Sequence, residues 1–547
     1  MSKSKTKTRR ATSVPAVGGV TADIDRSRIR AGFMRDGKSP TFAGWMPQLR
    51  DAREDVQAAW PLATARAIDS MQNVGWIAGG IEQAVANTVG TGLRLDAKPA
   101  RRLFASNTSY SEWTKKVEEE FAIYARNPYE CDVEARRNFG QQQAVALRSY
   151  FAAGEAVAEF PWRRRPGATY ATKTRVVPPQ RLSQRSADLD RIIQGVQMDA
   201  DGMPVAYLFR VDDKLAGLGA YGQEIVKRAR DGMGRPNVLH VFDGMAGQVR
   251  GITPLVPALR VARQFDQLAN ATLMKAIISQ AFAASITSDE VTEEAIRGLI
   301  TPQEEARFKS QGVSPYDVWF EAQSGWYDRA AIDLGVAGRL VHLFPGQKLD
   351  LHASEGAPPN FKDFALFLLR EIARALGITY ESMTGDYAGV TFSSVRFATD
   401  EIWRIVMMRR QNIVAPFCQA VYEAWLEEAI DNGTIEFPGG IENFIMNRAA
   451  ACNAEWKGSP KPQADEGVAA RANETHLKMG TKSEFQIAEE NGEDYEDVVV
   501  ERARAKQLRK ENGIDDPILG QPQPDKTDES GGQRDTPPKK PEPAAAN

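Results

Sequence analysis

Residues 32–39, Gly-Phe-Met-Arg-Asp-Gly-Lys-Ser, match the phosphate-loop pattern GxxxxGK[ST] and so have the residue types of a nucleotide site. In that chemistry, backbone N–H groups surround the phosphates, the lysine contacts the outer phosphates and the hydroxyl binds Mg²⁺. The loop must also follow a buried strand and begin a helix. Residues 25–30 are too charged for a central strand, and Pro40 disfavours helical geometry at Ser39. We interpret the match as a coincidence.

Residues 217–222, Gly-Leu-Gly-Ala-Tyr-Gly, match the dinucleotide fingerprint GxGxxG, and Asp243 follows at about the spacing of the ribose-binding acid. The three charged residues 212–214 separate this loop from the preceding candidate strand. The helix that would have to follow, residues 224–230, is too short to pack on a sheet. A surface loop is the better interpretation.

The remaining candidates for chemistry are isolated. No metal-binding spacing connects the four histidines, His240, His342, His352 and His476. Residues 199–202 resemble the start of a calcium loop, but a hairpin turn explains them. We expect Glu427 and Glu428 to be solvated on a helix surface, and Arg163–Arg165 to form a solvated basic loop. No GxSxG nucleophile elbow occurs. The sequence therefore predicts no catalytic residue, no metal ligand and no cofactor, and a protein that is not an enzyme.

Composition favours a soluble intracellular protein of several structural units. The chain has 547 residues, with 69 Lys and Arg against 72 Asp and Glu, and three cysteines that are far apart. A near-zero charge argues against a protein that grips nucleic acid. No apolar run reaches the ~18 to 20 residues of a membrane span. The basic start is not followed by an apolar signal core.

The first 250 residues or so mix helices with short strands. Two helices are expected over 60–88 with a break near Asn73–Gly75, and a hairpin is expected around Asp201-Gly202 within 191–211. Further expected elements are helices over 111–126 and 136–150 and strands over 93–95, 156–160 and 238–242. The fold class predicted from this pattern is α+β.

The second half is richer in helix. Long helices are expected over 254–286, 361–376 and 393–430, the last kinked at Pro416, and charged helices over 464–479 and 494–510. Long helices need partners, either within the subunit or in neighbouring copies. Residues 1–25 and 513–547 are expected to be disordered tails, the first basic and the second rich in proline.

Several short segments, in one order along the chain, resemble the lambda-type family of portal proteins of tailed bacteriophages. They are residues 87–94, 153–156, 202–207, 238–242, 247–255, 376–381, 384–386, 392–396 and 425–427, and they lead into the region around Trp456. The chain departs from the family pattern after Trp456, where Lys461-Pro462-Gln463-Ala464-Asp465 replaces an Asp-Pro pair. The shared order covers about residues 45–510.

The resemblance implies a ring, typically of twelve subunits, at one capsid vertex, through which double-stranded DNA is packaged and ejected without sequence recognition. It implies a wing (26–253 and 377–460), stem helices with an intervening clip (254–376) and a helical crown (461–512). The implied partners are the terminase large subunit, a head–tail connector or adaptor, and the major capsid and scaffold proteins, but no membrane. The implied location is the virion, after assembly in the host cytoplasm.

Two alternatives stay open at this point. One is a DNA-packaging ATPase that uses Gly32–Ser39. The other is a DNA-binding head scaffold protein that uses the basic N-terminus and Arg163–Arg165. The balanced charge favours the portal interpretation, because a strongly basic channel would hold the duplex through many phosphate contacts and stall its passage.

Overall fold

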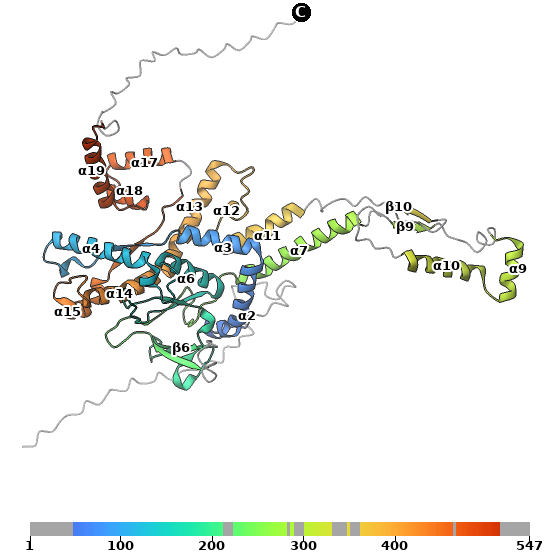
Figure 1. Ribbon diagram of the computed structural model, residues 1–547, viewed down its shortest axis with the longest axis horizontal. Helices are drawn as coiled ribbons and strands as arrows, with labels where there is room; N and C mark the ends of the chain where they lie inside the picture. Colours follow the sequence, from blue (N-terminus) through green and yellow to red (C-terminus); the bar gives the residue numbers. More distant parts are fainter. Residues whose placement is uncertain are drawn as a thin grey trace, which may run out of the picture.

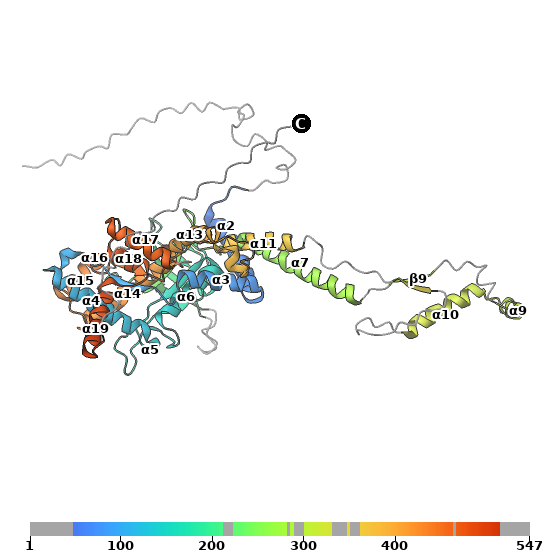
Figure 2. The ribbon, with the colours of Figure 1, turned by 90° about the horizontal axis from the view of Figure 1, so that it is seen from above.

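The computed structural model describes residues 48–211, 223–281, 285–288, 300–330, 347–350, 361–462 and 466–514. These residues form a body and a long arm that projects from it (Figures 1 and 2). The body contains all of the larger sheets and most of the helices, whereas the arm is made by the chain between helices α7 and α11. The predicted helix-rich α+β class is confirmed.

The body is mostly helical. Its α-helices are α2(Ala52–Asn73), α3(Gly75–Thr88), α4(Asn107–Arg126), α5(Pro128–Cys131), α6(Phe139–Ala153), α12(Tyr380–Thr384), α13(Phe392–Arg409), α14(Ala415–Asp431), α15(Gly440–Met446), α16(Arg448–Ala451), α17(Glu466–Lys478), α18(Glu484–Glu490) and α19(Tyr495–Glu511). Short 3₁₀ helices lie at η1(Arg101–Leu103), η2(Pro179–Arg181) and η3(Asp188–Asp190), and a π-helical turn, η4(Arg410–Val414), joins α13 to α14.

The strands form three small antiparallel sheets in the body. Their bounds are β1(Arg94–Ala97), β2(Glu155–Glu159), β3(Arg175–Val177), β4(Ile192–Ile193), β5(Val196–Met198), β6(Pro204–Arg210), β7(Glu224–Arg228), β8(Val238–Phe242) and β11(Ala454–Lys457). The strand orders are β3-β2-β8, β4-β5-β6-β7 and β1-β11. In the last pair Arg94 lies opposite Lys457, so two segments that are far apart in the sequence lie side by side.

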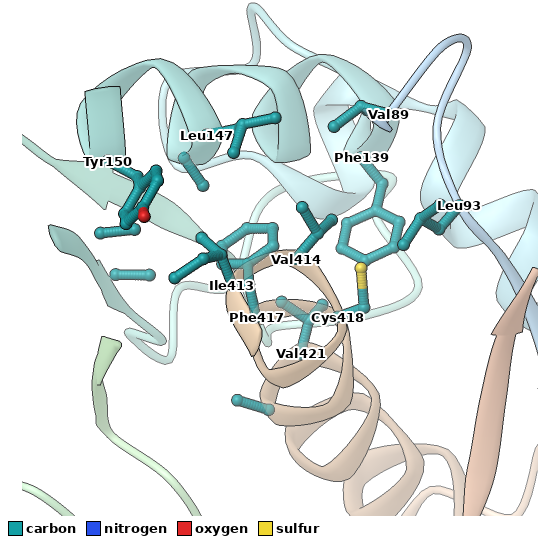
Figure 3. Close-up of a cluster of buried hydrophobic side chains, with 14 of the residues drawn as sticks. Val89, Leu93, Phe139, Leu147, Tyr150, Ile413, Val414, Phe417, Cys418 and Val421 are labelled. Atoms are coloured by element: carbon teal, nitrogen blue, oxygen red, sulfur yellow. The ribbon is translucent and has the colours of Figure 1, made fainter. Parts of the chain in front are cut away.

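The core of the body is built around α14, in which every residue from Ala415 to Ile430 is buried or half-buried. Its Trp425 is fully buried, and the centre of the indole ring lies 5.1 Å from that of Phe121 and 5.6 Å from that of Tyr170. At the start of α14, Phe417 stacks on Phe139 of α6, with ring centres 6.0 Å apart (Figure 3). The aromatic residues that the sequence places at helical spacing in 111–126 are the buried face of α4.

The three cysteines, Cys131, Cys418 and Cys452, are all buried and unpaired. Burial raises the pKa of the Cys131 thiol to about 12 and holds the pKa values of the other two thiols well above the ordinary range. These side chains therefore act as small apolar residues of the core.

Most predicted elements are present, including the break between α2 and α3 and the hairpin of β5 and β6. Two predictions need correction. The helix expected over 254–286 ends at Ala281, and Ile286 lies in a strand. Residues 224–228, where the GxGxxG motif would have required a helix, form β7, an edge strand beside β6. The interruption in 393–430 is the π-turn Arg410–Val414, and Pro416 lies in the first turn of α14, which begins at Ala415.

Candidate functional site: the base of the extended arm

The arm runs outward along one helix and returns along another. α7(Val256–Ala281) leaves the body, β9(Ser285–Ser288) pairs antiparallel with β10(Gln347–Asp350), and α11(Phe361–Leu376) returns and packs against α7. Between the two strands lie α9(Pro302–Gln311) and α10(Pro315–Ala330), far from the body (Figures 1 and 2). The sequence predicted this outward helix, insert and returning helix.

Several large apolar side chains of the arm are exposed. One face of α11 is buried in the body and against α7, whereas Phe364 and Phe367 on its other face are 53% and 61% exposed. On α7, the side chains of Leu273, Met274 and Ile277 are each more than half exposed. Such apolar surface along one projection marks a contact with another protein surface.

The outgoing end of the arm is anchored by a buried ion pair. Arg250 lies a few residues before α7, and both Arg250 and Glu155 of β2 are fully buried. The Nε of Arg250 donates to both carboxylate oxygens of Glu155 at 2.9 Å, and its Nη2 donates to Oε1. The backbone N–H of Gly251 donates to Oε2 at 2.9 Å. The carboxylate therefore fixes both the side chain of Arg250 and the backbone that leads into the arm.

The same guanidinium also connects separate parts of the body. Its Nη1 donates to the carbonyl oxygen of Gln194 at 2.9 Å, and its Nη2 donates to that of Pro179 at 3.2 Å. Its carbon lies 4.7 Å from the centre of the Trp60 ring on α2. A buried charge is tolerated when its donors are satisfied, and here Glu155 and the carbonyl groups of Gln194 and Pro179 satisfy them.

His240 of β8 completes this network, with Nε2 2.8 Å from Oε2 of Glu155. Burial by itself raises the pKa of Glu155, but the charges and hydrogen bonds of Arg250 and His240 outweigh it and lower the pKa to about 2. Residues 153–156, 238–242 and 247–255, three of the segments that carry the family resemblance, therefore meet at one buried site. His240 has a structural role here.

The depressed pKa makes a prediction about acid stability. Glu155 has an ordinary pKa of 4.5, so the stability it contributes is fully present above about pH 4.5 and is lost as the pH falls towards 2. The free energy of unfolding of the wild-type chain should exceed that of Glu155→Gln at pH 7, and the excess should shrink by on the order of 2 kcal/mol at pH 3. Urea unfolding of both proteins at pH 7 and at pH 3 measures this excess. An excess that is the same at both pH values would contradict the lowered pKa of Glu155.

Glycines allow β2 and the approach to the arm to touch. Gly154 has φ +84°, and a Cβ added there would lie 2.0 Å from the carbonyl carbon of Ile252. A Cβ on Gly251 would lie 2.1 Å from the carbonyl oxygen of Gly154. Just beyond, Oγ1 of Thr253 donates to the carbonyl oxygen of Phe151 at 2.6 Å. The backbone at the base of the arm is therefore in direct contact with the backbone of the body.

A matched pair of substitutions tests this contact. Gly202 has φ +87°, but no atom lies within 4 Å of its added Cβ. Gly202→Ala should cost only the left-handed backbone strain, about 1–2 kcal/mol. Gly154→Ala should cost the same strain and about 1–3 kcal/mol more for the overlap with Ile252. Denaturant unfolding of both variants measures the difference between their losses of unfolding free energy. Equal losses would contradict the prediction, because they would show that the backbone at Ile252 moves away from the added Cβ at no energetic cost.

The returning end of the arm is anchored at a second place. Helix α11 stops at Gly377, which has φ +65°, and Leu376 and Ile378 on either side are buried. Helix α3 of the body reaches this point, since a Cβ on Gly80 would lie 2.5 Å from Cδ1 of Leu376. The diagnostic segment 376–381 of the resemblance is therefore the joint at which the arm re-enters the body.

Arg410, in the π-turn, connects the end of α3 to the C-terminal part of the chain. Its Nε donates to the carbonyl oxygen of Thr88 at 2.7 Å, which satisfies the end of α3. Its Nη2 donates to the carbonyl oxygens of Asn87 at 3.2 Å and Ser459 at 2.9 Å. Burial lowers the pKa of Arg410 to about 10. No local sequence pattern predicts this role, although residues 87–94 are among the resembling segments.

The expectation that Glu427 and Glu428 are solvated is wrong. Glu428 is buried, and its carboxylate accepts the backbone N–H groups of Ala171 and Thr172 at 2.6 and 2.7 Å. Glu427 forms an ion pair with Arg448 at 2.8 Å. The loop that Glu428 holds lies more than 250 residues earlier in the chain, so the local charge pattern could not reveal the contact.

The basic run 163–165 is only partly solvated. Arg163 and Arg164 are exposed, as expected. Arg165 instead donates through Nη1 to the carbonyl oxygens of Asp132 at 2.8 Å and Tyr129 at 3.1 Å, and through Nη2 to that of Val133. Its charge therefore serves the structure of the loop and is not presented to a partner.

The nucleotide-like motifs find no support. Residues 32–39 and 217–222 both lie outside the described ranges, but the helix that the second motif requires is replaced by strand β7. In residues 199–202, Oδ1 of Asp199 accepts the N–H groups of Asp201 and Met203, as in a hairpin turn. No group of metal-binding side chains is found within the described part of the chain. Nor is any helix there long and apolar enough to cross a membrane.

Comparison with known proteins gives one consistent result. Residues 38–410 match the sequence profile of the family described as phage portal protein, lambda family. The chain is 27% identical over 484 residues to the portal protein of Escherichia phage N15, covering 87% of this chain and 89% of that protein. It is 26% identical over 503 residues to portal protein B of Escherichia phage lambda, covering 90% and 92%.

Among solved structures, a chain from the virion of a native gene transfer agent particle is similar with a TM-score of 0.42 and 14% identity, covering 81% of this chain and 98% of that one. A TM-score this low does not establish a shared fold, so the assignment depends on the sequence match. That match supports neither the packaging ATPase nor the DNA-binding scaffold. With more than half of its length matched by the family profile, this chain belongs to the lambda family of phage portal proteins.

Proposed function

We propose that copies of this chain close into a ring at one vertex of a phage capsid, and that double-stranded DNA passes through the channel of the ring during packaging and ejection. The observation that carries this proposal is the arm: its two ends are rigidly anchored in the body, while Phe364 and Phe367 of α11 and the apolar residues of α7 are exposed. A repeated head-to-tail contact between arms buries this surface, and such a contact closes when its rotation divides a full turn.

The charge of the chain suits passage of DNA. The 69 basic and 72 acidic residues give a formal charge of −3, so a ring of such subunits carries no overall basic excess. DNA that slides through a channel must break each phosphate contact that it makes, and a basic lining would slow it. The ring encloses the duplex and does not read its sequence.

The parts of the subunit follow from this placement. Residues 254–376 form the stem and clip, because they contain the arm with its distal helices α9 and α10. Residues 26–253 and 377–460 form the wing, and residues 461–512 form the crown. Apart from residues 513 and 514, the tails at 1–25 and 513–547 lie outside the described ranges.

The partners follow from the position in the particle. The clip contacts the terminase large subunit during packaging and a head–tail connector or adaptor afterwards, while the wing contacts the major capsid and scaffold proteins. Assembly takes place in the host cytoplasm and the ring remains in the virion. The chain is a structural component, and ATP hydrolysis is supplied by the terminase.

Negative-stain electron microscopy of the purified full-length chain tests the proposal. Closed rings with a central channel are expected, typically of twelve subunits, together with weak retention of DNA that does not depend on sequence. Monomers at high protein concentration in every buffer would overturn the ring. DNA-stimulated ATP hydrolysis that disappears in Lys38→Ala would favour the packaging ATPase instead.

A further inference from the structure

Helix α19, the last helix in the described part of the chain, has little contact with its own subunit. It is 17 residues long, and none of these residues is buried. It packs against α18 at the edge of the body (Figure 1). An isolated helix of this length is marginal in water, and tertiary packing supplies most of the stability of helices in proteins. A surface outside the subunit is therefore needed to cover α19.

The charges of α19 are divided along its length. The acidic residues Glu496, Asp497 and Glu501 come first, and the basic residues Arg502, Arg504, Lys506, Arg509 and Lys510 follow. Acids in the first turn and bases in the last turn suit the helix dipole, but Arg502 and Lys506 lie in the middle of the helix. Together with Lys510 they form a row at four-residue spacing, and like charges at that spacing destabilise a helix. The helix dipole does not explain this row.

An acidic row lies on the opposite side of the helix from the basic row. Asp497 is nine residues before Lys506, and nine residues are about two and a half turns. Glu501 stands in the same relation to Lys510. All four side chains are exposed, and no ion pair joins any of them to another described residue. The helix therefore presents two exposed rows of opposite charge, which face in opposite directions.

The remaining charges of α19 follow this division with one exception. Helical spacing places Arg509 near the basic row, Glu511 near the acidic row and Glu496 between the two. Arg504 is the exception, because it lies near the acidic row, three residues after Glu501. The acidic side still carries three carboxylates against one arginine, so it remains negative.

Two parallel α19 helices that lie side by side bring the rows together when one is shifted along the other by nine residues. The shift is about 13 Å, or half of the helix, and it places Lys506 of one helix beside Asp497 of the other and Lys510 beside Glu501. Because the rows lie on opposite sides, each helix can have one neighbour on each side. Such a head-to-tail contact can continue around a ring of equivalent subunits.

We propose that α19 of each subunit binds α19 of the next subunit through these two rows, with Lys506 and Lys510 paired to Asp497 and Glu501 of the neighbour. This contact rests on the ring of the proposed function, but it involves no residue of the arm. DNA fits α19 less well than a second copy does, because phosphates would pair with the basic row and be repelled by the acidic row.

Cross-linking of rings assembled from unlabelled and ¹⁵N-labelled full-length chains tests the contact. A carbodiimide joins a lysine directly to a carboxylate that it touches. Mass spectrometry should find Lys506 joined to Asp497 and Lys510 joined to Glu501, in products with one light and one heavy peptide. Within one chain these side chains lie on opposite sides of the helix. Rings in which these lysines are joined only to other segments, or to none, would overturn the proposal.

Charge reversal gives an independent test. Asp497→Lys with Glu501→Lys, and separately Lys506→Glu with Lys510→Glu, bring like charges together. Each pair should raise the protein concentration at which half of the rings dissociate by about tenfold at low salt, as measured by sedimentation velocity. All four substitutions in one chain exchange the two rows, so they should restore the wild-type value. Rings that no pair weakens, or that the fourfold variant does not restore, would overturn the contact.

The same proteins separate this contact from the alternatives. If Lys506→Glu with Lys510→Glu lowers the retention of DNA but leaves the rings unchanged, DNA and not the next subunit is the partner of the basic row. A wild-type chain that forms no rings would overturn the proposed function together with this contact. Wild-type rings that respond to none of the charge reversals would overturn this contact alone.

Discussion

Replacement of Arg250 by methionine is expected to lower the free energy of unfolding by about 3–5 kcal/mol, because it leaves the Glu155 carboxylate buried without its main cationic partner. It also removes donors from the carbonyl oxygens of Gln194 and Pro179. Methionine keeps most of the volume, so the loss reports the charge and its hydrogen bonds more than a cavity. Urea unfolding at one fixed protein concentration measures it.

A second ion pair provides the matched control. Arg148 donates to Glu82 through two nitrogens, at 2.7 and 2.6 Å, but both side chains are exposed. Arg148→Met should therefore cost less than about 1 kcal/mol. The double change Arg250→Met with Glu155→Leu should recover part of the loss, because it leaves no charge unpaired. If Arg250→Met and Arg148→Met cost the same, the network at the base of the arm does not anchor it.

Replacement of both Phe364 and Phe367 by aspartate should abolish ring formation while the subunit stays folded. Each phenylalanine buried between neighbouring arms contributes about 1.5–3 kcal/mol to the contact, and the two carboxylates would have to lose their hydration there. Both side chains are more than half exposed in the subunit, so their replacement removes little from its own core. Sedimentation velocity and negative-stain microscopy of the variant should show monomers.

The control for this variant is Ile123→Asp on α4, where the side chain is 62% exposed on the body. That protein should still form rings. The dissociated double variant should still unfold in one cooperative transition in denaturant, which shows that the subunit itself stays folded. Rings that persist with aspartate at both 364 and 367 would mean that subunits are held together by surfaces other than α11.

The sequence predicted the elements well where a local pattern defines them. Helix α11 has an unbroken apolar stripe and a glycine directly after it, so both of its ends were predictable. The aromatic spacing in 111–126 likewise identified the buried face of α4. Strand β8 is a short apolar run whose bounds match the prediction, because its neighbours on both sides are polar or turn-forming.

The site could not be predicted in the same way, because its partners are distant in the sequence. Glu155 meets Arg250 across 95 residues, and Glu428 meets Thr172 across 256. In its own segment, each of Glu155, Arg250 and Glu428 looks like an ordinary surface charge. Only the packing of the whole body shows that these side chains are buried. The family resemblance contained part of this information, because three of the resembling segments, residues 153–156, 238–242 and 247–255, meet at Glu155.

The π-turn at residues 410–414 could be predicted from the sequence only in part. Proline at 416 correctly indicated an interruption, but the structure places Pro416 in the first turn of α14, where its missing N–H costs nothing. The interruption is the preceding π-turn, which Arg410 stabilises through its bonds to Thr88 and Ser459. A π-turn of this kind has no local sequence signal, because distant carbonyl groups hold it in place.

The burial of Cys131, Cys418 and Cys452 has a practical consequence. Maleimides react with thiolates at the surface, and these three thiols are both inaccessible and held in the protonated form. The native chain should therefore take up almost no dye, so that a single cysteine introduced at the tip of the arm would be the one labelled position. Energy transfer between such labels on neighbouring subunits would then report the spacing of the arms while DNA moves between them.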